Sequence, residues 1–413
     1  MYLFKRSSIY DFLLVLYVIL QFFGLYGGTF QPIRIYAIIL FPFIIFNKHI
    51  LIVGSKIRLV IVFASFTAFY SFLCLFWSKN FEDGFNSSLF LLLNLLTFFE
   101  FLFLGYLAKD SYYSIWKGWF FFILLTLPIA YIELIFDKHL SVSFVESQTA
   151  IGATGVFKRF ASVTFGNYNL YNFILAIGFP VLSSIYFNEK YKRGFLLKYT
   201  LVFVLFSTFL IVISNGSRGA LLSLLLSLII FFLYYLKKNI KKTITLLKII
   251  VITMVVISGS VYYIVNSDFF FYILFRLQSK GYEDNTRSDL FVAGFEMLRD
   301  SYFFGVGGGN FMDNLNSTSY KGNPLPPHNV FAEIFSQYGI VVFLLFLSIL
   351  FIIYNKFYNR TIEVKYILVV SLVTMIVNFM IQSSYLLTSY MWIYFGSLYC
   401  FSQFNVKNIG ENV

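Results

Sequence analysis

The chain has 413 residues, of which 59% are hydrophobic and only 12% are charged. Soluble domains have about 45–50% apolar and about 25% charged residues, so this composition excludes an ordinary soluble protein. The net charge of +12 does not indicate a nucleic-acid partner, because the basic residues lie in short segments between apolar blocks rather than on one soluble face. The blocks have the length that crosses a bilayer and lack the period-two alternation of barrel strands. They predict an all-α, polytopic integral membrane protein.

The apolar blocks predict about twelve transmembrane helices in a single membrane domain over residues 1–413. The first block follows Lys5 and Arg6 without a small-residue cleavage site, so we interpret it as a retained helix. Cys74 and Cys400 both fall inside apolar blocks and indicate neither a disulfide framework nor a metal site. The predicted spans, in chain order, are 9–26, 33–47, 58–77, 87–108, 116–136, 168–187, 199–214, 218–236, 244–265, 335–354, 365–382 and 386–404.

Basic residues in the connecting segments predict the orientation. Most of the 31 lysines and arginines fall in segments that the positive-inside rule then places in the cytoplasm, together with both termini. Arginine grips phosphate with two parallel hydrogen bonds, whereas lysine is a hydrated point charge. The arginines are concentrated in the outer segments, which indicates an anionic ligand there, the alternative being chance in a small sample. The outer arginines are Arg34, Arg159, Arg218, Arg276, Arg287 and Arg299.

Two outer loops are long, at 137–167 and 266–334, and both keep aromatic and aliphatic residues. Long ordered loops of this kind tend to be functional. In the second loop, Thr286 can cap an amphipathic helix that ends near Asp300 and lies on the membrane surface or on the bundle. The apolar face of that helix is predicted to hold Leu290, Phe291, Phe295 and Leu298. A glycine run at 305–309 follows, which can form a backbone nest for phosphate or a hinge.

A polar break between two apolar spans is the first candidate site. Ser217 is a natural cap for the helix that begins beside it, so the amides of that helix point outward, where they bind phosphate well. Arg218 adds a full positive charge at the same place. A charged residue near membrane depth is costly and is functional by default, the alternative being an arginine that extends to the interface.

The large outer loop supplies two further candidates. Arg287 lies at the start of the predicted loop helix, where the same dipole argument applies; the alternative is a surface arginine paired with Glu283, Asp284 or Asp289. His328 precedes Asn329, a predicted cap for the tenth span. A nearby helix start disfavours the protonated ring, which leaves the imidazole available as a base. The alternative is a structural histidine bonded to a loop carbonyl.

These stretches resemble the O-antigen ligase/polymerase superfamily of bacterial cell-surface polysaccharide enzymes. Ser217-Arg218-Gly219-Ala220 is similar to its serine-arginine-glycine signature, and Arg287-Ser288-Asp289 followed by Ser301 to Gly307 is similar to its arginine-helix-glycine stretch, although Tyr302 stands where members often have proline. His328-Asn329 followed by Gly339-Ile340 resembles the motif that closes the long loop. Arg159 to Asn169 resembles an earlier outer-loop motif, with Gly166-Asn167-Tyr168-Asn169 in place of Asn-Pro-Asn.

The resemblance implies a membrane glycosyltransferase of the bacterial inner membrane that uses no cofactor and no metal. Its donor is an undecaprenyl-diphosphate-linked oligosaccharide in the lipid bilayer, and a chain-length regulator and a flippase are further implied partners. By resemblance, Arg218 and Arg287 bind the diphosphate, with Ser217, Arg159 and Asn329 as further substrate-binding residues, and His328 activates the acceptor hydroxyl. We expect an O-antigen or capsule polymerase. The alternatives are an O-antigen ligase that transfers glycan to lipid A core and, from another class, a transporter of the same lipid.

Overall fold

The computed structural model describes residues 9–142, 159–188, 195–239, 285–381 and 384–404, and every regular element in these ranges is helical. Short 3-10 turns extend several of the helices, among them η1 (Gln21–Phe23), η3 (Cys74–Phe76), η4 (Ser184–Phe187) and η8 (Tyr385–Leu387). The α-helices are α1 (Ile9–Leu20), α2 (Pro32–Ile45), α3 (Ile50–Lys56), α4 (Arg58–Leu73), α5 (Phe81–Leu107), α6 (Ser111–Phe136), α7 (Tyr168–Ser183), α8 (Phe195–Asn215), α9 (Arg218–Asn239), α12 (Asn285–Asp300), α13 (Phe311–Asn314), α14 (Val330–Asn355), α15 (Ile362–Asn378) and α16 (Ser389–Gln403).

Each predicted span within the described ranges coincides with a helix, and the span predicted at 244–265 lies outside them. Seven of the described helices are long and apolar enough to cross a membrane by themselves, or eight if the bent pair α2 and α3 is one span. The chain is therefore an all-α polytopic membrane protein, as predicted. The number of crossings stays a prediction.

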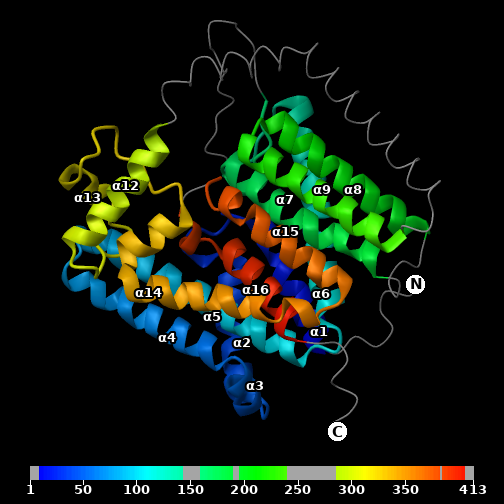
Figure 1. Ribbon diagram of the computed structural model, residues 1–413, viewed down its shortest axis with the longest axis horizontal. Coiled ribbons are helices and arrows are strands. Elements are labelled where there is room, and N and C mark those ends of the chain that lie inside the picture. The colour runs from blue at the N-terminus through cyan, green and yellow to red at the C-terminus, as the bar shows by residue number, and fades with distance from the viewer. Residues whose placement is uncertain (1–8, 143–158, 189–194, 240–284, 382–383, 405–413) are drawn as a thin grey trace, which may run out of the picture.

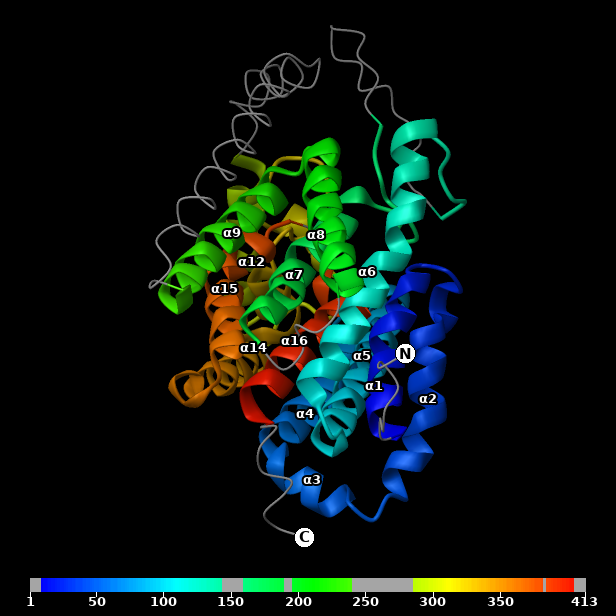
Figure 2. The same cartoon turned by 90° about the vertical axis from the view of Figure 1, so that its right-hand side faces the viewer.

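Two groups of helices form the bundle (Figures 1 and 2). In one group, α5 packs against α1, α2, α4 and α16, and in the other α7 packs against α8 and α9, with α15 beside α9. The core lies where α7 and α16 pass between the groups: 94% of the apolar window of α7 is buried, and nearly every residue of α16 is buried. Helices buried on all sides have no polar face turned toward water.

The segments predicted to face outward gather at one end of the bundle. The Thr164 hydroxyl donates to the Phe22 carbonyl, and the Trp77 indole donates to the Gly305 carbonyl at 2.8 Å. The Arg34 guanidinium, which is buried, donates to the Leu387 carbonyl at 3.2 Å. Loops far apart in the sequence thus form one polar end, and its side of the membrane stays a prediction.

The described part of the large outer loop contains the predicted amphipathic helix as α12, which packs against α14 (Figure 1). The helix begins at Asn285 and buries Leu290 and Met297 against Phe311. Phe295, predicted on the buried face, is 51% exposed. Leu290 and Leu298 are buried as predicted, and Ala293 and Met297 are buried as well because Phe311 of α13 packs against that side of the helix.

The glycine run after α12 packs into a break in α14. Gly339 interrupts α14 with a φ of 75° and a ψ of 179°. The Val306 amide donates to the Ser336 carbonyl at 2.8 Å, and the Gly307 amide donates to the Gln337 carbonyl at 2.9 Å. Since these carbonyls lose their helical partners at the break, the glycine run replaces them. The amides of Val306 and Gly307 are therefore bonded to α14 and do not form an open nest for phosphate.

Candidate functional site

The predicted polar break is the turn that joins α8 to α9. α8 ends at Asn215, and Gly216 has a φ of 65°, the left-handed conformation that glycine adopts readily after a helix. Ser217 is buried and its carbonyl accepts from the Leu221 amide at 2.9 Å, and α9 begins at the exposed Arg218. Arg218 therefore lies in the first turn of α9, where backbone amides point out of the helix, as predicted from the sequence.

A buried amide holds this turn to the segment that precedes α7. The Asn215 side chain donates to the Ala161 carbonyl at 3.0 Å and to Asn172 Oδ1 at 2.9 Å, and it accepts from the Ala161 amide at 2.7 Å. Asn215 belongs to the predicted polar break but was not among the predicted site residues. The sequence feature that could have indicated Asn215 is a side-chain amide at the end of an apolar span, where a polar side chain needs hydrogen-bond partners.

Arg159 contacts a different helix end. Its guanidinium donates to the carbonyls of Leu134 and Ile135, which belong to the last turn of α6. A cation at this end of a helix satisfies carbonyls that have no intrahelical partner and balances the helix dipole. The structure therefore gives Arg159 a capping contact, and its predicted role toward substrate stays a prediction.

Beside it lies a carboxylate and histidine cluster that the sequence analysis missed. Glu133 is fully buried and its Oε2 accepts from the Ser162 and Val163 amides at 2.7 and 2.8 Å. His139 Nδ1 lies 3.5 Å from Glu133 Oε1, and its Nε2 lies 3.3 Å from Asp137 Oδ1. These contacts attach the segment before α7 to the end of α6. Within the described ranges, no group of three or more His, Cys, Asp or Glu side chains is arranged to hold a metal ion.

Arg287 is exposed in the first turn of α12, and its Nη1 donates to the Met380 carbonyl at 2.9 Å. Met380 lies just beyond the end of α15 at Asn378. Of the acidic partners considered for Arg287, Asp289 is exposed, and Glu283 and Asp284 lie outside the described residues. The arginine is thus attached to the connection between α15 and α16, more than ninety positions along the chain.

His328 lies at the tip of a tight turn, where the Asn329 amide donates back to the Pro327 carbonyl at 2.7 Å. Its side chain is half-buried. Asn329 caps α14 as predicted, because its side-chain oxygen accepts from the Phe331 and Ala332 amides at 2.8 and 3.2 Å. The cap fixes the direction in which the chain enters α14, so it also fixes the residue before it.

The three predicted motifs contact one turn, Phe379–Ile381, which follows α15. The first carbonyl of the turn accepts from the Val330 amide at 3.2 Å, two residues after His328. The middle carbonyl accepts from Arg287. Gly219 lies against the third residue, since a Cβ there would be 3.2 Å from its Cγ1. Segments around positions 218, 287 and 328 therefore converge at the polar end of the bundle.

An apolar groove adjoins this convergence between α12 and α14. Its cavity volume is about 330 Å³, and its lining exposes no polar surface. Phe291 lies one helical turn after Arg287, and Phe331 lies two residues after Asn329, so the groove begins beside both motifs. It is lined by Phe291, Phe295, Leu298, Phe331, Phe335, Ile340 and Phe343.

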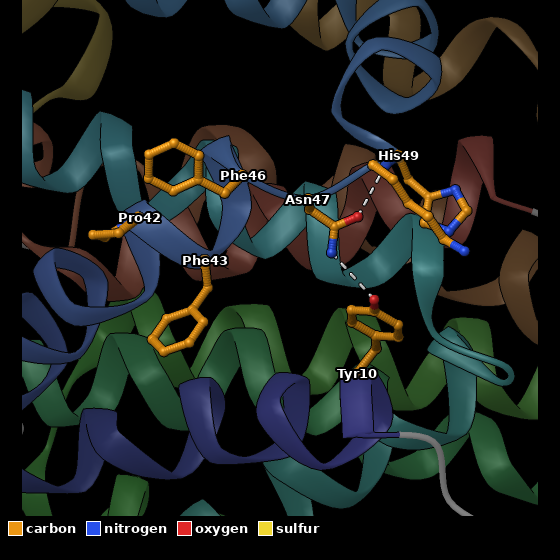
Figure 3. Close-up of a pocket in the computed structure, with 7 residues that line it drawn as sticks. Tyr10, Pro42, Phe43, Phe46, Asn47 and His49 are labelled. Carbon is orange, nitrogen blue, oxygen red and sulfur yellow. Dashed lines mark hydrogen bonds between the residues drawn. The ribbon is translucent and has the colours of Figure 1, made fainter.

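A second hollow lies between α1 and the end of α2 (Figure 3). It belongs to the opposite end of the bundle, because α2 begins near Arg34 at the polar end and ends at Ile45. The Asn47 side chain bridges its two walls, because it donates to the Tyr10 hydroxyl at 3.2 Å and accepts from the His49 amide at 3.0 Å. None of the predicted site residues lines this hollow. It is open and broad, but the predicted chemistry lies at the other end.

Fold and site together define a polytopic membrane protein with cationic helix starts gathered at one end of the bundle. Residues 201–347, which include the Arg218, Arg287 and His328 segments, match the family model described as O-antigen ligase. The match supports the resemblance to the O-antigen ligase/polymerase superfamily, whose members are glycosyl-transferring enzymes that work on lipid-linked polysaccharide in the membrane. A search of the curated proteins found no match to this chain.

Proposed function

We propose that this protein is a polysaccharide polymerase that joins undecaprenyl-diphosphate-linked repeat units at the outer face of the bacterial inner membrane. One observation supports this site above any other in the described residues: Gly219, Arg287 and the start of α14 all contact the turn Phe379–Ile381. That contact brings two cationic helix starts and one imidazole-bearing loop to the same region.

The proposed reaction is a glycosyl transfer. The oxygen of an acceptor hydroxyl attacks the anomeric carbon of the donor, the bond from that carbon to the diphosphate oxygen breaks, and the diphosphate leaves with the electron pair. His328 takes the proton of the hydroxyl, and a positioned general base contributes about 10²–10⁴-fold. Negative charge develops on the leaving diphosphate, where positive groups stabilise it most.

Arg218 and Arg287 supply that positive charge. Both side chains are exposed in the first turns of helices, so the guanidinium groups and the outward amides act on the same anion. In this proposal the arginines neutralise the diphosphate without a metal ion. The apolar groove between α12 and α14 begins beside Arg287 and is suited to the isoprenoid part of the donor, because its lining is aromatic and aliphatic.

A donor and acceptor assay tests the proposal. Purified protein in detergent is given a lipid-linked repeat unit, alone or with lipid A core as a second acceptor. Elongated chains that remain linked to undecaprenyl diphosphate are the expected product. Glycan attached to lipid A core without elongation would mean that the protein is a ligase instead. A protein that extends no glycan but still moves the lipid across vesicle membranes would be a transporter.

A further inference from the structure

A buried carboxylate joins the first turn of α14 to the connection between α15 and α16. Glu333 is 3% exposed and lies one turn after the Asn329 cap. Its Oε2 accepts from the Tyr385 amide at 2.8 Å, and its Oε1 accepts from the Leu386 amide at 3.1 Å. A buried carboxylate is costly unless it is hydrogen-bonded, and amide donors to a carboxylate form strong bonds. Both oxygens are thus committed to the backbone of η8.

Other side chains hold the same turn by its carbonyls. The Asn94 side chain and the Trp392 indole donate to the Leu386 carbonyl at 3.1 and 2.9 Å. Arg34 donates to the next carbonyl, that of Leu387. Because α2, α5, α14 and α16 all bond to η8, its backbone is fixed to the bundle from several sides.

Tyr385 connects η8 to the turn Phe379–Ile381, which contacts Arg287. Its hydroxyl donates to the Asn378 carbonyl at 2.7 Å, and its ring centroid lies 6.2 Å from that of Phe379. The two sides of the connection are therefore joined directly, whatever the course of residues 382–383, which lie outside the described ranges. The carbonyl that accepts from Arg287 is that of Met380, two residues after Asn378.

We propose that Glu333 is a positioning residue that holds Arg287 and His328 in a fixed position relative to each other. Glu333 belongs to the first turn of α14, the helix that His328 precedes. It also bonds the α15–α16 connection, and the Met380 carbonyl of that connection accepts from Arg287. The inference rests on the proposed function, since it assigns Glu333 to the geometry of the lipid diphosphate site. Without the carboxylate, the start of α14 keeps the bond from the Val330 amide to the Phe379 carbonyl but loses both of the Glu333 bonds to η8.

The choice of residue has a chemical reason. An ionised carboxylate has two acceptor oxygens, whereas the amide of glutamine has one acceptor oxygen and one donor group. Glu333→Gln therefore keeps the shape of the side chain, loses one bond to η8 and places a donor against a backbone donor. If the reaction needs Arg287 and His328 in this relative position, the loss of one hydrogen bond to a charged group corresponds to a fall of roughly ten- to a hundredfold in kcat/KM.

The test is a double-mutant comparison on the purified full-length protein with an undecaprenyl-diphosphate-linked repeat unit as substrate. Glu333→Gln is expected to raise the donor KM in the wild-type background and to change it little in an Arg287→Ala background, because its effect on donor binding acts through Arg287, whereas its effect through His328 falls on kcat. Glu133→Gln is the matched control, since Glu133 is also buried and bonds two backbone amides. Its effect is expected to be the same in both backgrounds.

Tyr385→Phe makes the same comparison if Glu333→Gln does not yield folded protein, because it removes only the hydroxyl bond to the Asn378 carbonyl. An equal loss from Glu333→Gln, or from Tyr385→Phe, with and without Arg287 would overturn the inference and leave the proposed function standing. An Arg287→Ala protein with unchanged kcat/KM would remove the proposed role of Arg287, and the inference with it, whereas a wild-type protein that makes no elongated chains would remove the proposed function itself.

Discussion

Replacing Gly339 by alanine is expected to separate the glycine run from α14 and to destabilise the polar end of the bundle. The Gly339 backbone has a φ of 75° and a ψ of 179°, a region that only glycine occupies without strain. A Cβ at this position would lie 2.5 Å from the Phe303 carbonyl oxygen and 2.6 Å from the Phe304 carbonyl oxygen. Both atoms are backbone, so neither can rotate away as a side chain can.

The magnitude follows from two costs. Forcing a residue with a Cβ into this backbone region costs about 1–3 kcal/mol. Relieving the contact moves the Phe303 carbonyl, which accepts from the Ile340 amide at 3.0 Å, and a lost hydrogen bond of this kind costs about 0.5–1.5 kcal/mol. The combined loss is roughly 1.5–4.5 kcal/mol, a large share of the stability of a typical domain.

Thermal unfolding of the purified protein, with limited proteolysis of the segment 301–327, measures this loss. Gly28→Ala is a control for backbone strain alone, because Gly28 also has a positive φ, of 56°, but has nothing within 4 Å of its Cβ position. Gly54→Ala is a control without strain, since the nearest atom would be 3.6 Å away. A Gly339→Ala protein that unfolds and resists protease like Gly28→Ala would refute the packing argument.

Two further changes test the contacts around the site. Asn215→Ala leaves the buried Ala161 amide and carbonyl without their partner, which costs roughly 2–4 kcal/mol, and calorimetry that finds no change would contradict this. The Ser319 amide lowers the pKa of Glu296 by donating to it, so this contact is present above the ordinary pKa of a glutamate and is lost as the pH falls through the lowered value. Hydrogen exchange at Ser319, corrected for intrinsic rates, should lose protection on acidification in the wild type and show no such step in Glu296→Gln.

Local features of the site could be predicted from the sequence because their causes are local. Asn-Gly-Ser between two apolar spans marks the turn at Gly216 and the start of the next helix at Arg218, and both lie there. Asn329 before an apolar run predicts the cap that it forms. The helix of the large loop follows from its apolar spacing, although the face that it buries depends on α13, which covers Leu290.

The long-range features could not be predicted in the same way. Arg287 is held by a backbone carbonyl at Met380, and every non-proline residue has such a carbonyl, so the partner has no signature in the sequence. The attachment of Glu333 to η8 depends on the packing of α14 against the α15–α16 connection. Both α7, with 94% of its window buried, and α9, with 28% buried, are apolar enough to be predicted as membrane spans, because lipid and protein interior are both apolar.

The most direct test of the account is the rate of glycosyl transfer by purified Arg218→Ala protein with a lipid-linked donor. Loss of a group that stabilises the leaving charge is expected to lower the chemical rate by about 10²–10³-fold. Arg299→Ala is the control, because Arg299 is an exposed arginine at the far end of α12 that pairs with Asp300 at 2.8 Å. We expect a folded Arg218→Ala protein with that loss and an Arg299→Ala protein with none. Similar rates of glycan transfer by the two variants would contradict the role of Arg218 in stabilising the leaving diphosphate.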